Sequence, residues 1–290
     1  MAETAPYRGL YINLDRSFER RARFEAQLAH LGLSERYARN PGIDGAKLSL
    51  PASQLRPGEV GAFHSHTRAL DEASGFGTPV HILEDDALLS EHAAPVIEGA
   101  IAAKFFDAFD IMFTDMFVAP NLGILKSLKT AFDRVNLAGG RVLRFGDVQI
   151  LDLAGQNFSC LTSYVVGARA IARVHALCAA ELAAGPRLPV DLFIRNCVAS
   201  GQLRAGLAVP FVTSFDFDEV AKSTIVQGEG ARPSVAVLAA LRYSFYVKRD
   251  LARANAGLEA AIGKREAANP HSELILRAVG FVLSDAFKEF

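Results

Sequence analysis

A short apolar segment that runs directly into three adjacent carboxylates is the feature that most constrains the fold of this chain. Residues 79–83 (PVHIL) are typical of a buried strand, and Glu84, Asp85 and Asp86 follow without a break. Three neighbouring negative charges repel one another, so they need compensation if the strand end is buried. Divalent cations prefer oxygen ligands and provide that compensation. An acidic strand end in contact with solvent is the alternative interpretation.

The start of the chain predicts the opening of an α/β unit. Leu10, Ile12 and Leu14 alternate with less apolar residues, which is the pattern of a strand. A helix is expected directly after it, beginning at a cap provided by Ser17 and ending at Gly32. A strand, a polar turn and a helix in this order are typical of nucleotide-binding α/β domains.

Polar residues collect where the predicted strands end. Asn13, Asp15 and Arg16 follow the first strand, and the triplet at 84–86 follows a later one. In open α/β sheets, ligands bind outside the carboxyl ends of the strands. The two polar clusters are therefore predicted to share one crevice, although they are far apart in the sequence.

Periodicity predicts further elements on both sides of the triplet, while residues 119–150 are less regular. Helices are expected over 60–70, 96–101, 125–135 and 168–184, and strands over 80–83, 109–113 and 163–167. Residues 229–290 have a helical pattern, in whose first part apolar residues alternate with Arg242, Lys248, Arg249 and Arg253. This segment predicts either a helix packed on the main domain or an amphipathic helix on a membrane surface.

Composition excludes several classes of protein. Half of the 290 residues are hydrophobic and the formal net charge is −1, which argues against a nucleic-acid binder that works by bulk electrostatics. Cys160, Cys178 and Cys197 have no CxxC spacing, so neither a zinc site nor a disulfide framework is expected. No signal-peptide pattern is visible, and no apolar run reaches the roughly 18–20 residues that span a bilayer. We expect a cytoplasmic protein, with peripheral contact to the inner face of the membrane as a further option.

Several short motifs occur in an order that is similar to one known family. They are YINLDRSFERR at 11–21, DG at 44–45, GEVGAFHSH at 58–66, EDD at 84–86, PVD at 189–191 and VPFV at 209–212. This order resembles glycosyltransferase family 25, which includes lipopolysaccharide galactosyltransferases of Gram-negative bacteria and collagen galactosyltransferase domains. The resemblance covers residues 7–228 and leaves 229–290 as a helical C-terminal extension. Ala62 and His64 depart from the family's second motif, where a cysteine and an apolar residue are common.

The resemblance implies a GT-A-type, Rossmann-like α/β fold and an inverting, metal-dependent hexosyltransferase. The expected reaction moves a hexose, with galactose as the first candidate, from a UDP-sugar to a hydroxyl group of a cell-surface glycan such as lipopolysaccharide. The acceptor is then a glycan or lipid-linked glycan, and the cofactor is Mn²⁺ or Mg²⁺. The alternatives are a non-catalytic relative that binds nucleotide sugar or glycan, and a metal-dependent phosphohydrolase, for which no nucleophile motif is recognisable.

The acidic triplet is the expected metal site of such an enzyme. An ion on a diphosphate takes only one or two protein carboxylates and completes its shell with phosphate and water oxygens. Asp86 is the first choice as a direct ligand, with Glu84 as the second. Asp85 is expected to contact the UDP-sugar donor. Asp85 could instead be the second ligand. Glu84 or Asp85 could also accept hydrogen bonds from metal-bound water or from the ribose.

The segment after the first strand is expected to bind the donor. Arg16 and Arg20 are candidates for the diphosphate, because a guanidinium fork matches phosphate oxygens. Asn13 and Asp15 are expected at the nucleoside. Asp15 could instead cap the helix or pair with Arg16.

Ser65 and His66 match the family's second motif and are further candidates for donor binding. His66 could position a phosphate or a carboxylate. A structural histidine on a partly apolar helix is the alternative.

Inversion requires a carboxylate that deprotonates the acceptor hydroxyl on the face opposite the leaving group. Asp191 is the first candidate, and Asp115 is the reserve because it ends a strand expected beside the triplet. Asp191 could also be the N-cap of a helix running to Val198, and one residue could do both. Residues 223–225 (STI) resemble a late family element near the sugar or diphosphate.

Overall fold

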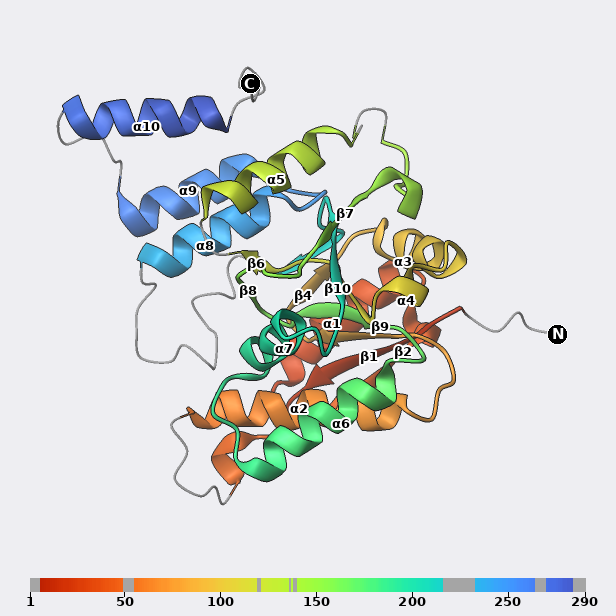
Figure 1. Ribbon diagram of the computed structural model, residues 1–290. Coiled ribbons are helices and arrows are strands. Elements are labelled where there is room, and N and C mark those ends of the chain that lie inside the picture. Colours follow the sequence, from red (N-terminus) through yellow and green to blue (C-terminus); the bar gives the residue numbers. More distant parts are fainter. Residues whose placement is uncertain are drawn as a thin grey trace.

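The computed structural model describes residues 6–48, 55–118, 121–135, 137, 140–215, 233–263 and 270–283. Figure 1 shows a central mixed sheet with helices on both of its faces. The predicted α/β class is confirmed by this architecture. The expected element at 223–225 lies outside the described residues.

Seven strands form the central sheet of this part of the chain, in the order β2-β1-β3-β9-β5-β10-β7. β1 (Arg8–Asn13) lies between β2 (Tyr37–Pro41) and β3 (Val80–Glu84) and is parallel to both. β9 (Ser163–Val166) runs antiparallel to both of its neighbours and so interrupts the parallel pairing. The other strands are β5 (Ile111–Phe113), the parallel β10 (Ala205–Val209), and β7 (Gln149–Asp152), which is antiparallel to β10.

Two small sheets lie beside the central one. β4 (Ala87–Leu89) follows the acidic triplet directly and pairs with β11 (Thr213–Phe215), and β6 (Phe117–Val118) pairs with β8 (Phe158–Ser159). The triplet is thus held from both sides, by β3 before it and by β4 after it. Shorter helical elements and α5 complete the description: η1 (Ser34–Arg36), η2 (Gly45–Lys47), α4 (Phe105–Ala108), α5 (Leu122–Asp133) and η3 (Phe145–Asp147).

Alternate residues of β1 pack against opposite layers of helices, as the two-residue period of a strand requires. Tyr11 packs against Phe24 on one face, with 4.9 Å between ring centroids, and Leu10 shares an apolar cluster with Phe63 on the other. Phe24 belongs to α1 (Phe18–His30), which covers one face of the sheet together with α3 (Ala93–Ala102). Phe63 belongs to α2 (Pro57–Ala73), which covers the other face together with α6 (Ile171–Ala184) and α7 (Val190–Ala199). Ser17 is at the N-cap of α1 as predicted, but its side chain makes no capping hydrogen bond.

The direction of the chain across the sheet reverses at β1. From β1 the chain passes through α1 to β2 on one side, and from β2 it returns through α2 to β3 on the other. The loops that leave β1 and β3 therefore separate at the carboxyl ends of these strands, where Ile12 is paired with Glu84. In open α/β sheets such a reversal point is where ligands bind.

The C-terminal segment is helical, as the sequence predicts. It contains α8 (Pro233–Ser244), α9 (Leu251–Ile262) and α10 (Pro270–Val282), and α8 packs on β6, β11 and α9 (Figure 1). The buried positions of α8 include Ala236, Ala239 and Arg242. In the described part of the chain, no helix is long and apolar enough to cross a membrane.

Candidate functional site

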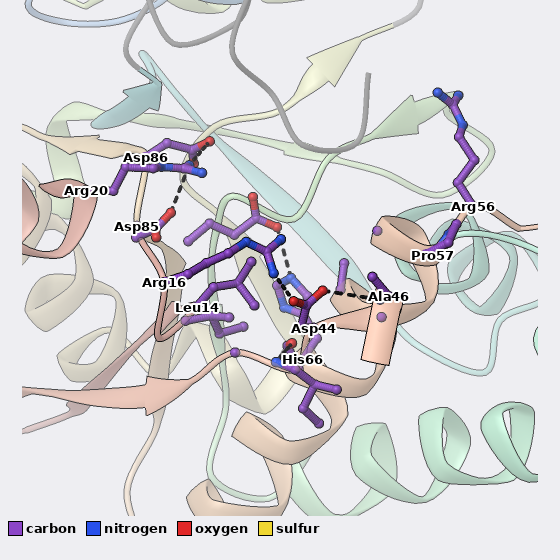
Figure 2. A pocket seen from close by; sticks show the side chains of 18 residues that line it. Leu14, Arg16, Arg20, Asp44, Ala46, Arg56, Pro57, His66, Asp85 and Asp86 are labelled. Atoms are coloured by element: carbon purple, nitrogen blue, oxygen red, sulfur yellow. Dashed lines mark hydrogen bonds and ion pairs between the residues drawn. The ribbon is translucent and has the colours of Figure 1, made fainter. Parts of the chain in front are cut away.

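A cavity of about 390 Å³ opens at the carboxyl ends of β1 and β3. Its walls come from the end of β1, the loop of residues 42–46, the first turns of α2 and the acidic triplet. Figure 2 shows Arg20 beside Asp85 and Asp86 on one side of the cavity and Arg16 beside Asp44 on another. The prediction that the two polar clusters share one crevice is borne out for Arg16 and the triplet.

Glu84 is held by a buried histidine. His66 Nε2 lies 3.2 Å from Glu84 Oε1, and His66 Nδ1 lies 3.0 Å from the hydroxyl of Tyr164. Because an ionised carboxylate only accepts hydrogen bonds, Nε2–H is the donor to Glu84 and the Tyr164 hydroxyl donates to Nδ1. Burial acts to raise the pKa of Glu84, but the hydrogen bond from His66 and the nearby charge of Arg20 outweigh it and lower that pKa. His66 therefore holds the Glu84 carboxylate in place from α2.

Asp85 and Asp86 are bridged by one arginine. Arg20 Nη2 lies 2.8 Å from Asp85 Oδ1 and 2.7 Å from Asp86 Oδ2. Despite this, burial and then the charge of Glu84 raise the pKa of Asp86 to about 7, and burial raises that of Asp85. Asp86 Oδ1 is buried and has no hydrogen-bond partner within the described residues. The arginine therefore leaves the negative charge of the triplet only partly compensated.

Asn13 lies behind the triplet rather than on the cavity wall. Its Nδ2 donates to Asp85 Oδ2 at 2.7 Å, and its Oδ1 accepts from Arg39 Nε at 2.9 Å. The amide thus ties the ends of the three parallel strands together. Asp15 is exposed and pairs with Arg39 at 2.5 Å, so the predicted alternative of a pair with Arg16 is wrong. Arg39 reaches Asp15 from the neighbouring strand β2, and the sequence positions of the two residues do not reveal this pairing.

The loop after β2 forms the wall opposite the triplet. Arg16 pairs with Asp44, and Asp44 Oδ1 also accepts from the backbone N–H of Ala46 at 3.2 Å. The Ser65 hydroxyl accepts from the Ile43 N–H at 2.8 Å and donates to the Gly61 carbonyl at 2.6 Å. Ser65 therefore fixes this loop on α2, which makes it a positioning residue of the cavity.

Asp191 lies in the first turn of α7, not at its N-cap, which is Pro189. Asp191 Oδ2 accepts from the backbone N–H of Cys160 at 2.8 Å, and Oδ1 accepts from that of Leu192 at 2.9 Å. Cys160 has a φ of 86°, a left-handed conformation that costs energy for a side chain other than glycine. The neighbouring Thr162 carbonyl accepts from the Glu84 N–H at 2.9 Å, which brings this segment to the end of β3.

Asp115, the reserve candidate for the base, is paired in the interior with a residue that sequence analysis does not place in the site. Arg242 of α8 donates to Asp115 Oδ2 through Nε at 3.0 Å and through Nη2. The guanidinium carbon lies 4.8 Å from the ring centre of Phe117 and 4.5 Å from that of Phe215. This enclosure makes Asp115 a structural counter-ion. An arginine in an otherwise apolar, alanine-rich helix is the signal that points to it.

Other residues of the site also carry little signal in the sequence. Asp44 belongs to a motif of the resemblance, although its pair with Arg16 is not predicted. Tyr164 is one apolar-strand residue among several, and Arg39 is one of many arginines near the start of the chain. Arg56 also lines the cavity, and Figure 2 shows its side chain extending away from the other polar groups.

The residues at the end of β3 fit a divalent cation that is shared with a substrate. Among the described residues, no group of three or more His, Cys, Asp or Glu side chains is arranged to hold a metal by itself. A Mg²⁺ or Mn²⁺ ion at a diphosphate needs only one or two protein carboxylates. Asp86 offers a buried, unpartnered oxygen for this purpose, and Glu84 lines the same cavity.

No protein-family model matches the chain, and no curated protein is significantly similar to it in sequence.

Proposed function

We propose that the protein is an inverting, metal-dependent glycosyltransferase with a GT-A-type fold. In this proposal it transfers a hexose, expected to be galactose, from a UDP-sugar to a hydroxyl of a cell-surface or lipid-linked glycan such as lipopolysaccharide. The observation that carries the proposal is the cavity at the reversal point of the sheet, which has arginines on its walls and three carboxylates at one end. The order of sequence motifs is the second support.

The cavity suits a nucleotide diphosphate in size and in chemistry. Its volume of about 390 Å³ falls within the range of small-molecule sites, roughly 300–1,000 Å³. Arg16 and Arg20 lie on its wall and can each present a guanidinium to phosphate oxygens. The apolar residues Ile12, Leu14 and Ile43 line the same cavity and offer surface for the base or ribose.

Glu84 and Asp86 would hold the Mn²⁺ or Mg²⁺ ion in this proposal. When bound there, such an ion neutralises the charge that develops on the leaving diphosphate. His66 would keep Glu84 ionised and oriented through its Nε2–H bond. Asn13 would keep Asp85 in place behind them through its amide.

Asp191 is proposed as the base that accepts the proton of the acceptor hydroxyl. Each of its carboxylate oxygens accepts one backbone N–H, which fixes the group and leaves further lone pairs for a substrate proton. Asp191 does not line the 390 Å³ cavity, and it anchors the backbone at Cys160, two residues before the Thr162 carbonyl that accepts from the Glu84 N–H. In this proposal the acceptor hydroxyl would reach Asp191 on the face opposite the leaving group, as inversion requires.

A non-catalytic nucleotide-sugar-binding protein is the second candidate. The observation that favours it is that each polar group proposed for catalysis already has an internal partner: Arg20 bridges two carboxylates, and both oxygens of Asp191 accept backbone N–H groups. Such a protein would bind UDP with a metal and never turn over.

The test is donor hydrolysis and transfer over a panel of UDP- and GDP-sugars, with Mn²⁺ and with EDTA, on the wild type and on Asp86→Ala. Turnover of one UDP-hexose that requires Mn²⁺ and is lost in Asp86→Ala, with the thermal unfolding temperature retained, would support the proposal. Binding of UDP without turnover would favour the non-catalytic candidate. Unchanged turnover in Asp86→Ala would remove the metal site from the proposal.

A further inference from the structure

Arg20 occupies a place where two cations compete for the same carboxylate. Its Nη2 contacts Asp85 Oδ1 at 2.8 Å and Asp86 Oδ2 at 2.7 Å. Asp86 is also the first proposed ligand of the divalent ion. A guanidinium and a divalent cation on one carboxylate repel each other strongly at such distances, since their interaction grows as the product of their charges.

Space beside Arg20 allows its side chain to move. It lines the cavity of about 390 Å³ together with Arg16 and His66, and it also lines a second cavity of about 180 Å³ together with Arg23 and Gln27. The Arg20 side chain thus borders two cavities, which give its guanidinium room to turn away from Asp86.

The remaining acids keep their partners if Arg20 releases Asp86. Asp85 retains the amide bond from Asn13, and Glu84 retains the bond from His66. Asp86, whose Oδ1 already has no hydrogen-bond partner among the described residues, is held by Arg20 at its other oxygen, Oδ2. Removal of Arg20 from this one carboxylate therefore exposes a single ligand position.

We propose that Arg20 is an exchangeable counter-ion of the acidic triplet. It holds Asp86 in the metal-free protein, gives Asp86 up to the divalent ion, and then turns into the larger cavity to bind the phosphates of the nucleotide. This inference rests on the proposed function, because it takes the metal and the nucleotide diphosphate as the ligands. Arg20 is thereby a positioning residue for the metal and a binding residue for the donor.

The exchange makes metal binding and nucleotide binding respond in opposite directions to the loss of Arg20. Arg20→Gln removes the competitor of the metal, so the affinity for Mn²⁺ alone is expected to rise, by about tenfold, which corresponds to about 1.4 kcal/mol. The same variant lacks a charged donor to phosphate, so the affinity for UDP at saturating Mn²⁺ is expected to fall by roughly tenfold or more. A residue that merely supported the fold would weaken both.

The experiment titrates Mn²⁺ into the full-length protein without nucleotide, at pH 8, and follows the free ion by electron paramagnetic resonance. UDP is titrated separately at saturating Mn²⁺ by calorimetry. Arg20→Lys keeps a cation and is expected to bind Mn²⁺ as the wild type does. Arg16→Gln is the matched control: Arg16 lines the same cavity but pairs with Asp44, so it should lose UDP affinity with no gain in Mn²⁺ affinity.

Two different results separate failure of this inference from failure of the proposed function. If the wild type binds Mn²⁺ and UDP but Arg20→Gln weakens both, or changes neither, the exchange is wrong and the proposed function stands. If neither the wild type nor any variant binds Mn²⁺ or UDP, the proposed function is wrong, and the exchange falls with it. A gain in Mn²⁺ affinity in Arg16→Gln equal to that in Arg20→Gln would also overturn the inference, since it would reflect net charge alone.

Discussion

Arg242 and Asp115 form an ion pair in the interior of the protein, and their side chains are 2% and 0% exposed. The aspartate follows β5, and the arginine comes from α8 near the other end of the chain. Phe117 and Phe215 lie against the guanidinium, which further separates the pair from water. The C-terminal segment thus supplies a charge to the interior of the α/β domain.

Loss of Arg242 alone should cost more stability than loss of both partners of this pair. Arg242→Met leaves a buried, unpaired carboxylate, so we expect the free energy of unfolding to fall by about 3–5 kcal/mol. In the double variant with Asp115→Asn, a part of this loss should be recovered, with a coupling energy above about 1 kcal/mol. Urea denaturation of the four proteins of the cycle gives these values.

Lys248→Met is the control for this cycle. Lys248 pairs with Glu91, but both side chains are largely exposed, at 51% and 41%. Exposed pairs contribute at most about 1 kcal/mol, so this change should be small. Strict additivity of the two interior substitutions would show that the pair is not coupled.

Asp191→Asn should lower turnover far more than it lowers stability or UDP affinity. The asparagine oxygen can still accept one of the two backbone N–H bonds, whereas it cannot take a proton from the acceptor. We expect kcat to fall by roughly 10²–10⁴-fold, the usual contribution of a general base. Steady-state kinetics and calorimetric UDP binding measure the two effects.

Asp152→Asn is the matched control, because Asp152 also accepts a backbone N–H, from Ala154 at 2.9 Å, at an exposed turn. Its kcat should remain that of the wild type. If activity in Asp191→Asn is lost only in proportion to a lowered unfolding temperature, the residue is structural and the base lies elsewhere.

His81 should make the folded protein sensitive to acid. It is buried between the Tyr37 hydroxyl, 2.7 Å from Nδ1, and the Ser163 hydroxyl, 2.8 Å from Nε2. Burial lowers the pKa of His81 from 6.5 to about 3. Between pH 6.5 and 3 the unfolded chain therefore binds a proton at His81 that the folded protein does not bind. The free energy of unfolding is unaffected by His81 above pH 6.5 and falls as the pH drops from 6.5 towards 3.

The measurement is the free energy of unfolding in urea at several pH values between 7.5 and 4. His81 should account for a slope of up to about 1.4 kcal/mol per pH unit below pH 6.5, and His81→Gln should remove that part. His30→Gln, at the exposed end of α1, should leave the slope unchanged. Equal slopes in the wild type and His81→Gln would contradict the prediction.

Gly61→Ala should damage the cavity through the backbone alone. A Cβ atom at Gly61 would lie 2.6 Å from both the Gly45 nitrogen and the Ile43 oxygen, so the loop that carries Asp44 would have to move. Overpacking of this kind costs about 1–3 kcal/mol of stability, and the affinity for UDP should fall with it. Gly146→Ala is the control, because nothing lies within 4 Å of the position of its added Cβ. Wild-type UDP affinity in Gly61→Ala would show that this wall does not contact the nucleotide.

The strands and helices nearest the site are encoded locally, and most could be predicted. β1 and β3 have continuous or alternating apolar residues, and α2 repeats its apolar residues at helical spacing, so neighbouring residues alone indicate these elements. β2 (YARNP) and β10 (AGLAV) could not be predicted in the same way. The first has no apolar alternation, and the second is a run of apolar residues and one glycine that is buried on both faces and shows no alternation.

That a strand ends in three carboxylates, and that a second polar cluster follows the first strand, can be predicted from the sequence alone. Which side chains meet these carboxylates follows from tertiary contacts: Arg20 pairs with Asp85 and Asp86, and His66 hydrogen-bonds Glu84. The same holds for Asp115, which pairs with Arg242. Secondary structure follows from periodicities of two to four residues, which any short window of the chain contains. The partner of a buried charge is set by distances of a few ångströms between segments that lie far apart in the chain, and these distances exist only once the sheet has assembled.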